Sequence, residues 1–302
     1  MQRIGVLVFG LSALVVGPVA AQDATGTTLW RVAATTLATP PALALGAAAA
    51  LWNPAQTQDS ARLQLAFEAI QTPSAIDATG VIATMRIPAG QLGHLGLLYG
   101  RVGLSDITAT ADSPDPTGST VPVYTHAFGA NWAKRLGGTD VGATLAFHET
   151  RLDQSTGDRW TVDVGASRSL AGDRVRIAAA THFFSSLSTD DPAQDVYAGV
   201  EARVWQGPVS DRGDRVVIRG RYGISFAHGF TADHQVGVGA DFSKIVTFDL
   251  LFAHEGGYSD GSWRAVAGLG LNIGKYRVAV ARDAGVNELG SAYRVGVEAR
   301  FK

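Results

Sequence analysis

The residues that could carry chemistry are scattered along this sequence rather than grouped. Seven histidines occur singly, at positions 94, 126, 148, 182, 228, 234 and 254, and only His228 and His234 flank one loop. Metal sites need several His, Cys or carboxylate ligands at defined spacings, so no metal site is predicted. The chain has no cysteine, which excludes disulfides and a thiol nucleophile.

His148, Asp153 and Ser155 are the residue types of a hydrolase triad and lie close together in the sequence. A serine nucleophile depends on a local context such as Gly-x-Ser-x-Gly, and Ser155 has no such context. We therefore predict that the protein is not an enzyme and holds no cofactor. Lys and Arg (25) nearly balance Asp and Glu (27), so nucleic acid is not expected as a partner.

Charged residues recur at alternate positions of apolar stretches, where they would share one face of a strand. Those that we expect to face an interior are Arg174, Arg176, Glu201, Arg203, Arg219, Arg221, Arg294 and Glu298. One interpretation is a field that steers anionic solutes or fatty-acid carboxylates. The other, which we favour, is a set of cross-strand ion pairs that also anchor an inserted segment.

The elements that would position these charges are strands. In the last segment Tyr293, Val295 and Val297 alternate with charged residues or glycine, which is the period of a strand with one apolar face. About fourteen segments are predicted as strands on this basis, most of them 9 to 14 residues long: 62–70, 78–87, 91–102, 121–134, 140–150, 158–169, 173–184, 195–206, 214–227, 233–242, 244–254, 262–272, 275–283 and 291–301.

Strands of this length suit a tilted path across a membrane. Their polar faces carry too many charges for a core, so we expect the apolar faces to contact lipid. Short connections, such as 88–90 and 273–274, alternate with longer polar ones, such as 103–120 and 151–157. This alternation is typical of outer-membrane barrels with periplasmic turns and external loops, and an even strand count places both termini in the periplasm. The connection 207–213 is an exception.

The N-terminus indicates export. Arg3, the apolar run 4–16 and the small residues Val19-Ala20-Ala21 form a signal peptide that we expect to be cleaved after Ala21. The predicted organisation is a signal peptide at 1–21, an N-terminal hatch or plug at 22–61, and an outer-membrane barrel at 62–302. A fourteen-stranded lumen is too wide for its own side chains to fill, and many predicted lumen positions are glycine or alanine, which leaves space for such a segment.

The stretch LALGAAAALWNPAQTQ, at 43–58, is too short to span a bilayer and is interrupted by Pro54. Pro54 would end any helix over 43–51, and Asn53 can hydrogen-bond its own turn. Trp52, Asn53, Pro54 and Ala55, placed between an Ala/Gly/Thr-rich segment and the first strand, resemble the motif of FadL-type outer-membrane transport proteins and the related PorV/PorQ-like proteins. An ordinary turn leading into the first strand is the alternative.

The resemblance implies a fourteen-stranded barrel with an N-terminal hatch, to whose geometry we assign Trp52, Asn53, Pro54 and Ala55. It also implies passage of hydrophobic small molecules across the outer membrane. A PorV-like structural or secretion-associated barrel and a small plugged porin remain open as alternatives. The polar loop 103–120 lacks the apolar cluster of a capture site. Expected partners are outer-membrane lipid, a hydrophobic ligand, and the barrel-assembly machinery, which would read a last strand ending in Phe301.

Overall fold

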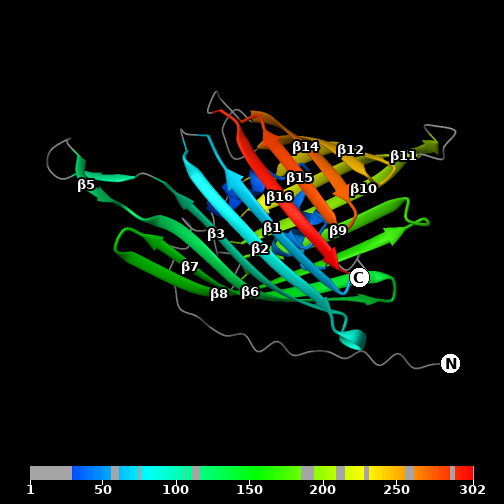
Figure 1. Cartoon of the computed structure of the whole chain (residues 1–302), viewed down its shortest axis with the longest axis horizontal. Helices are drawn as coiled ribbons and strands as arrows, with labels where there is room; N and C mark the ends of the chain where they lie inside the picture. The colour runs from blue at the N-terminus through cyan, green and yellow to red at the C-terminus, as the bar shows by residue number, and fades with distance from the viewer. Residues whose placement is uncertain are drawn as a thin grey trace.

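The computed structural model has one closed antiparallel barrel of fourteen strands (Figure 1). It describes residues 29–55, 61–73, 76–105, 107–110, 116–184, 194–208, 215–227, 231–255, 262–285 and 290–301. The predicted signal peptide at 1–21, both ends of the predicted hatch, at 22–28 and 56–60, and most of the exceptional connection 207–213 lie outside these residues.

The barrel confirms the predicted number of strands. Each strand pairs with the next along the barrel, and β16 closes it by pairing with β1 from Leu63↔Phe301 to Gln71↔Tyr293. The barrel strands are β1 (Leu63–Gln71), β2 (Ala78–Pro88), β3 (His94–Leu104), β6 (Val123–Leu136), β7 (Thr139–Leu152), β8 (Ser155–Leu170), β9 (Val175–His182), β10 (Asp195–Pro208), β11 (Arg215–Ala227), β12 (Asp233–Phe242), β13 (Val246–Glu255), β14 (Ser262–Ile273), β15 (Tyr276–Asp283) and β16 (Ala292–Phe301).

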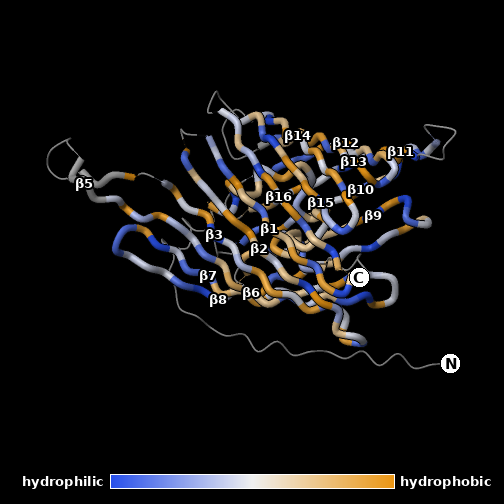
Figure 2. The backbone as a smooth tube through the Cα atoms, in the orientation of Figure 1, coloured by the Kyte–Doolittle hydropathy of each residue, from blue (hydrophilic) through white to orange (hydrophobic). Residues whose placement is uncertain are grey.

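Apolar side chains cover the outside of the barrel. Phe67, Phe128, Leu145 and Val295 are each about half exposed, and Figure 2 shows hydrophobic residues alternating with hydrophilic ones along the strands. Aromatic residues such as Trp160 and Trp263 add to this surface. A belt of this size on a closed sheet requires a nonaqueous surrounding, so the inverted arrangement expected from the sequence is present.

The two ends of the barrel differ in their connections. We call the end that holds Phe301 the turn end, where β6 and β7 are joined by Gly137 and Gly138, both with positive φ, as two-residue hairpin turns require. We call the opposite end the loop end. Most of the connections that contain residues outside the described ranges are at the loop end.

Two loop-end expectations need correction. The predicted loop 151–157 is a tight hairpin, because β7 runs to Leu152 and β8 begins at Ser155. Polar residues form strands here because this part of the hairpin lies beyond the apolar belt, where neither of its faces contacts lipid chains. Within the predicted loop 103–120, β4 (Thr108–Thr110) and β5 (Pro116–Thr120) form a small separate hairpin. It projects from the barrel at the left of Figure 1.

Residues 29–55, which we call the inner segment, lie inside the barrel (Figure 1, blue). Residues 29–35 are helical, η1 covers Pro41–Leu43 and η2 covers Ala48–Leu51. The segment 43–51 is therefore not one helix that Pro54 ends, because Gly46, with φ of 96°, interrupts it well before Pro54. No helix of the described residues is long and apolar enough to cross a membrane.

Glycines of the wall allow this close packing, as the small lumen residues suggested. A Cβ on Gly199 would lie 2.8 Å from Leu43 Cγ, and one on Gly268 would lie 2.6 Å from Ala38 Cβ. Gly142, Gly165, Gly223 and Gly100 face the inner segment as closely, opposite Pro54, Asn53, Pro40 and Trp30 respectively.

Candidate functional site inside the barrel

Asn53 holds the end of the inner segment together. Its side chain is fully buried, its Nδ2 donates to the carbonyl of Ala42 (2.6 Å), and its Oδ1 accepts from the backbone N–H of Ala55 (3.0 Å). The second bond closes a turn of the kind that asparagine favours, and the first ties this turn to η1. Asn131 on β6 donates to the carbonyl of Pro54 (3.3 Å), so the turn is also bound to the wall.

Arginines of the wall bind the carbonyl end of the helical residues 29–35. Arg294 on β16 donates to the carbonyl of Ala33 (2.8 Å) and to Thr36 Oγ1 (2.9 Å), and it pairs with Glu68 on β1 (2.7 Å). Arg264 on β14 donates to the carbonyl of Thr35 (2.6 Å). Cations at the carboxyl end of a helix are stabilised by its unpaired carbonyls and its dipole.

Two further contacts attach the inner segment to β9 and β10. Arg31 pairs with Asp195 at 2.7 Å, and Arg176 donates to the carbonyl of Leu43 at 2.8 Å. Ion pairs and hydrogen bonds donated by arginines thus hold the inner segment on several sides of the barrel. Arg31, Glu68 and Asp195 were missed as site residues, because a contact between positions so far apart leaves no pattern in a single sequence.

Four of the predicted interior charges, which lie on β9, β10 and β11, meet in one group with a carboxylate of β12 and one of β13. Glu201 lies 2.6 Å from Arg221, 3.6 Å from Arg176 and 3.8 Å from Arg219. Arg219 also pairs with Asp241, and Arg221 with Asp249. We call these six residues the lumen charge cluster. Its three arginines face three carboxylates, so its formal charge is balanced.

The other predicted interior charges lie elsewhere. Glu298 on β16 accepts from Arg300 (2.8 Å) and faces Gly46 of the inner segment. Arg203 donates to Gln206 Oε1 (2.8 Å) and to the carbonyl of Asp173 (2.7 Å) at the turn end. Arg174 is exposed at the same end. Arg174, Arg203, Arg294 and Glu298 are therefore outside the lumen charge cluster.

Apolar residues fill the other side of the lumen, toward the loop end. Trp30, Leu51 and Trp52 of the inner segment are buried in one cluster with wall residues of β1–β3 and β6, among them Ile82, Leu98, Val102 and Val123. Leu104, Ile107 and Val121, at the base of the β4–β5 hairpin, pack against the same cluster. The first end of the connection 103–120, through Leu104 and Ile107, and Val121 directly after it therefore contribute apolar contacts.

Phe183 closes this apolar cluster from the end of β9. It is buried, with φ of 63°, a conformation that costs energy for a bulky residue and needs support from its surroundings. Its ring contacts those of His182 (centroids 3.9 Å apart) and His148 (4.8 Å). Trp52 lies next to His182 (5.4 Å), and neither Trp52 Nε1 nor His182 Nε2 has a hydrogen-bond partner in the described part of the chain.

The candidate triad does not match this geometry. His148 is buried in the lumen with its Nε2 3.0 Å from Thr161 Oγ1, whereas Asp153 and Ser155 are exposed at the β7–β8 turn. Within the described ranges no group of three or more His, Asp or Glu side chains is arranged to hold a metal ion.

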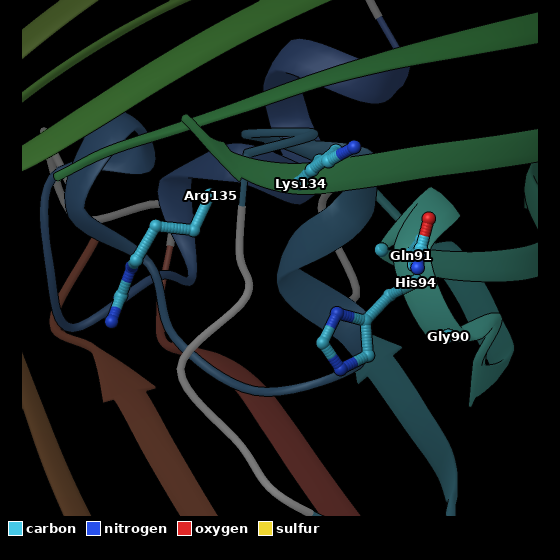
Figure 3. Close-up of a pocket in the computed structure, with 6 residues that line it drawn as sticks. Gly90, Gln91, His94, Lys134 and Arg135 are labelled. Carbon is cyan, nitrogen blue, oxygen red and sulfur yellow. The ribbon is translucent and has the colours of Figure 1, made fainter. Parts of the chain in front are cut away.

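Two hollows open at the turn end. One, of about 270 Å³, lies between the β2–β3 connection and the end of β6, and Figure 3 shows Gln91, His94, Lys134 and Arg135 around it. The other, of about 660 Å³, lies at the β10–β11 hairpin and is lined by Arg174, Arg203 and Arg215 together with residues 204–208.

Comparisons with known proteins find similar structures but no relatives. No family model and no curated protein matches the sequence. A KdgM porin aligns over 79% of this chain and 99% of its own, with 11% identity and a TM-score of 0.38. A mutant of the Rhodopseudomonas blastica porin aligns with the same coverage, 10% identity and a TM-score of 0.42. Similarity at this level carries no functional argument.

The class of the protein follows from its own geometry. A closed antiparallel sheet of fourteen strands with an apolar exterior and a polar, charge-paired interior is a transmembrane β-barrel of the outer-membrane type. The pairing of β1 with β16 closes the sheet into a cylinder.

Proposed function

We propose that the protein is a FadL/PorV-type outer-membrane barrel that passes hydrophobic small molecules and whose inner segment is its hatch. The observation that carries the proposal is the division of the lumen. The apolar cluster around Trp30 and Trp52 extends to Leu104, Ile107 and Val121 at the loop end, whereas the lumen charge cluster lies toward the turn end. A solute entering from the loop end would meet apolar side chains first.

The polar bonds of the inner segment support a role as a hatch. A few arginine and asparagine side chains of the wall hold it through carbonyl groups. Its other contacts are the Arg31–Asp195 ion pair, the apolar packing of Trp30, Leu51 and Trp52, and small residues against glycines of the wall. Such an element can move as a unit when a few bonds exchange for water. In this proposal Trp52, Asn53, Pro54 and Ala55 fix the path of the chain from the hatch toward β1.

Orientation and targeting complete the proposal. The turn end would face the periplasm, the signal peptide at 1–21 would be cleaved after Ala21, and the last strand, ending in Phe301, would be recognised by the barrel-assembly machinery. The exposed apolar belt provides the surface for outer-membrane lipid.

A crosslink tests the hatch directly, because the chain contains no cysteine. The Cβ atoms of Ala38 and of a residue replacing Gly268 would lie 2.6 Å apart, so a small outward shift reaches the about 3.5–4.5 Å of a disulfide. In A38C/G268C we expect uptake of a labelled fatty acid or alkane into proteoliposomes to stop under oxidation and to return under reduction. A38C/G270C is the matched control, because Gly270 faces Thr247 and Arg277 instead.

Removing part of the segment tests whether it closes the lumen. Deletion of residues 42–55 should raise single-channel conductance in planar bilayers, and an unchanged conductance would contradict a hatch. A PorV-like scaffold is the second candidate, favoured by the dense packing of the inner segment against the wall. It predicts that neither reduction nor deletion produces uptake of hydrophobic compounds.

A further inference from the structure

Four aromatic side chains form one row on the outer face of the barrel near the loop end. The strand register places them directly opposite one another on β3, β6, β7 and β8, in the order Tyr99, Phe128, Phe147 and Trp160. The ring centroids of Tyr99 and Phe128 are 5.0 Å apart, and those of Phe147 and Trp160 are 5.3 Å apart. Aromatic residues on the outside of a barrel lie near the lipid headgroups, so this row marks the loop-end edge of the apolar belt.

A row of charged and titratable side chains follows the aromatic row toward the loop end. On each of the four strands it contains the residue two positions beyond the aromatic one, which lies on the same outer face. In the same strand order these residues are Arg101, His126, Glu149 and Asp158. The arginine and the histidine are therefore on β3 and β6, and the two carboxylates are on β7 and β8. One step further, Tyr124 of β6 lies opposite Arg151 of β7.

Arg101 and Arg151 lie on either side of Tyr124 on this outer surface. The guanidinium of Arg101 lies over the Tyr124 ring, with its Cζ 4.7 Å from the ring centroid. Arg151 donates to the carbonyl of Asp153 at 3.0 Å. Both arginines are exposed, and neither forms an ion pair with a carboxylate of the described residues. A guanidinium that stacks on a ring keeps its N–H edge available for the oxygens of a phosphate.

The position of this surface indicates its ligand. In the orientation proposed above the loop end faces the outside, so the charged row lies at the headgroups of the outer leaflet. That leaflet consists largely of phosphorylated glycolipid, whose phosphates would meet guanidinium groups placed just beyond the aromatic row. Glu149 and Asp158 repel an anion, which confines the site to the part of the surface around Tyr124.

We propose that Arg101 and Arg151 bind a phosphate of an outer-leaflet glycolipid whose acyl chains lie along the aromatic row. The proposal rests on the orientation of the barrel in the membrane. It is independent of what passes the lumen, so it can fail while the hatch stands, and the hatch can fail without it.

Binding of bisphosphorylated lipid A to the delipidated, detergent-solubilised full-length barrel, followed by native mass spectrometry, tests the site. In Arg101→Gln/Arg151→Gln we expect the dissociation constant to rise by about thirtyfold, the loss that corresponds to two cations near an anionic headgroup. Arg168→Gln/Lys244→Gln removes the same charge from exposed positions at the turn end and should change it by less than about twofold. Heat-modifiable gel mobility verifies that each variant is folded.

The carboxylates of the row provide a test of opposite sign. Glu149→Gln/Asp158→Asn removes two negative charges beside the site, so the dissociation constant of lipid A should fall by at least about twofold. A rise would mean that the carboxylates hold the lipid through a shared cation, and it would overturn direct contact of the phosphate with the arginines.

Three further results would overturn the proposal. They are equal loss in the two variants that lack two cations, equal binding of lipid A without phosphates, and equal binding of phosphatidylglycerol. Orientation is measured separately with Ser155→Cys at the exposed β7–β8 turn, which a membrane-impermeant maleimide should label on intact cells. Absence of labelling would place the loop end in the periplasm and exclude the glycolipid as its ligand in the cell, whatever the binding in detergent.

Discussion

Gly142→Ala is the substitution that should release the inner segment while leaving the wall intact. A Cβ at this position on β7 would lie closer than 3.0 Å to the carbonyl of Pro54 and 2.8 Å from the backbone N of Ala55. These are backbone atoms, so no side-chain rotation relieves the contact. The backbone of Gly142 has an ordinary negative φ, and the strand itself accepts alanine.

The expected magnitude follows from two contributions. Overpacking by one methyl group costs about 1–3 kcal/mol, and losing the bond from Asn131 to Pro54 costs about 1 kcal/mol. The free energy of docking of the inner segment to the wall is therefore weakened by a total of about 2–4 kcal/mol. This raises the population of the undocked state by about thirtyfold to several hundredfold. Open-state events in planar bilayers should become more frequent by the same factor.

Gly220→Ala is the control, because its nearest neighbour would be Val204 Cγ1 at a normal 3.7 Å. It should leave both conductance and heat-modifiable mobility unchanged. Equal opening frequencies in Gly142→Ala and Gly220→Ala, with both barrels folded, would refute the docking of Pro54 against β7.

Three further substitutions examine other parts of the structure. Asn53→Ala removes the bonds to Ala42 and Ala55 and should weaken docking by about 2 kcal/mol, seen as a lower yield of the oxidised A38C/G268C crosslink. Glu201→Gln removes the charge that faces three arginines and should lower the free energy of unfolding in urea by about 3–5 kcal/mol; an unchanged value would mean that water already screens the cluster. Leu145→Arg, in the middle of the lipid face, should cost about 2–4 kcal/mol, whereas Leu152→Arg at the loop end should cost about 0–1 kcal/mol. Equal folded fractions of these last two variants in lipid vesicles would contradict the position of the belt.

The wall of the barrel could be predicted from the sequence because each strand carries its own period. β14, for example, was expected at 262–272 and is found at Ser262–Ile273. The period is lost where the bilayer no longer imposes alternation. At 151–157 polar residues occur on both faces, so the sequence resembles a loop although it forms the β7–β8 hairpin.

The site was less accessible to sequence reasoning because its bonds are not local. That Asn53 would close its own turn could be foreseen, since the acceptor and donor are two residues apart. The partners of Arg294 could not, because Ala33 and Thr36 are far away in the chain and are bound through a carbonyl and a hydroxyl. Any residue type offers a carbonyl, so such contacts leave no compositional signal.

The contact of Arg294 with the inner segment also constrains the order of assembly. The segment precedes β1 in the chain, yet it is bound by β16, the last strand to be synthesised. A closed cylinder whose interior is packed this tightly gives a folded segment little room to enter afterwards. The segment must therefore lie in the interior before β1 and β16 pair. Pairing of the final strand then completes the barrel and the binding of the inner segment by Arg294 in one event.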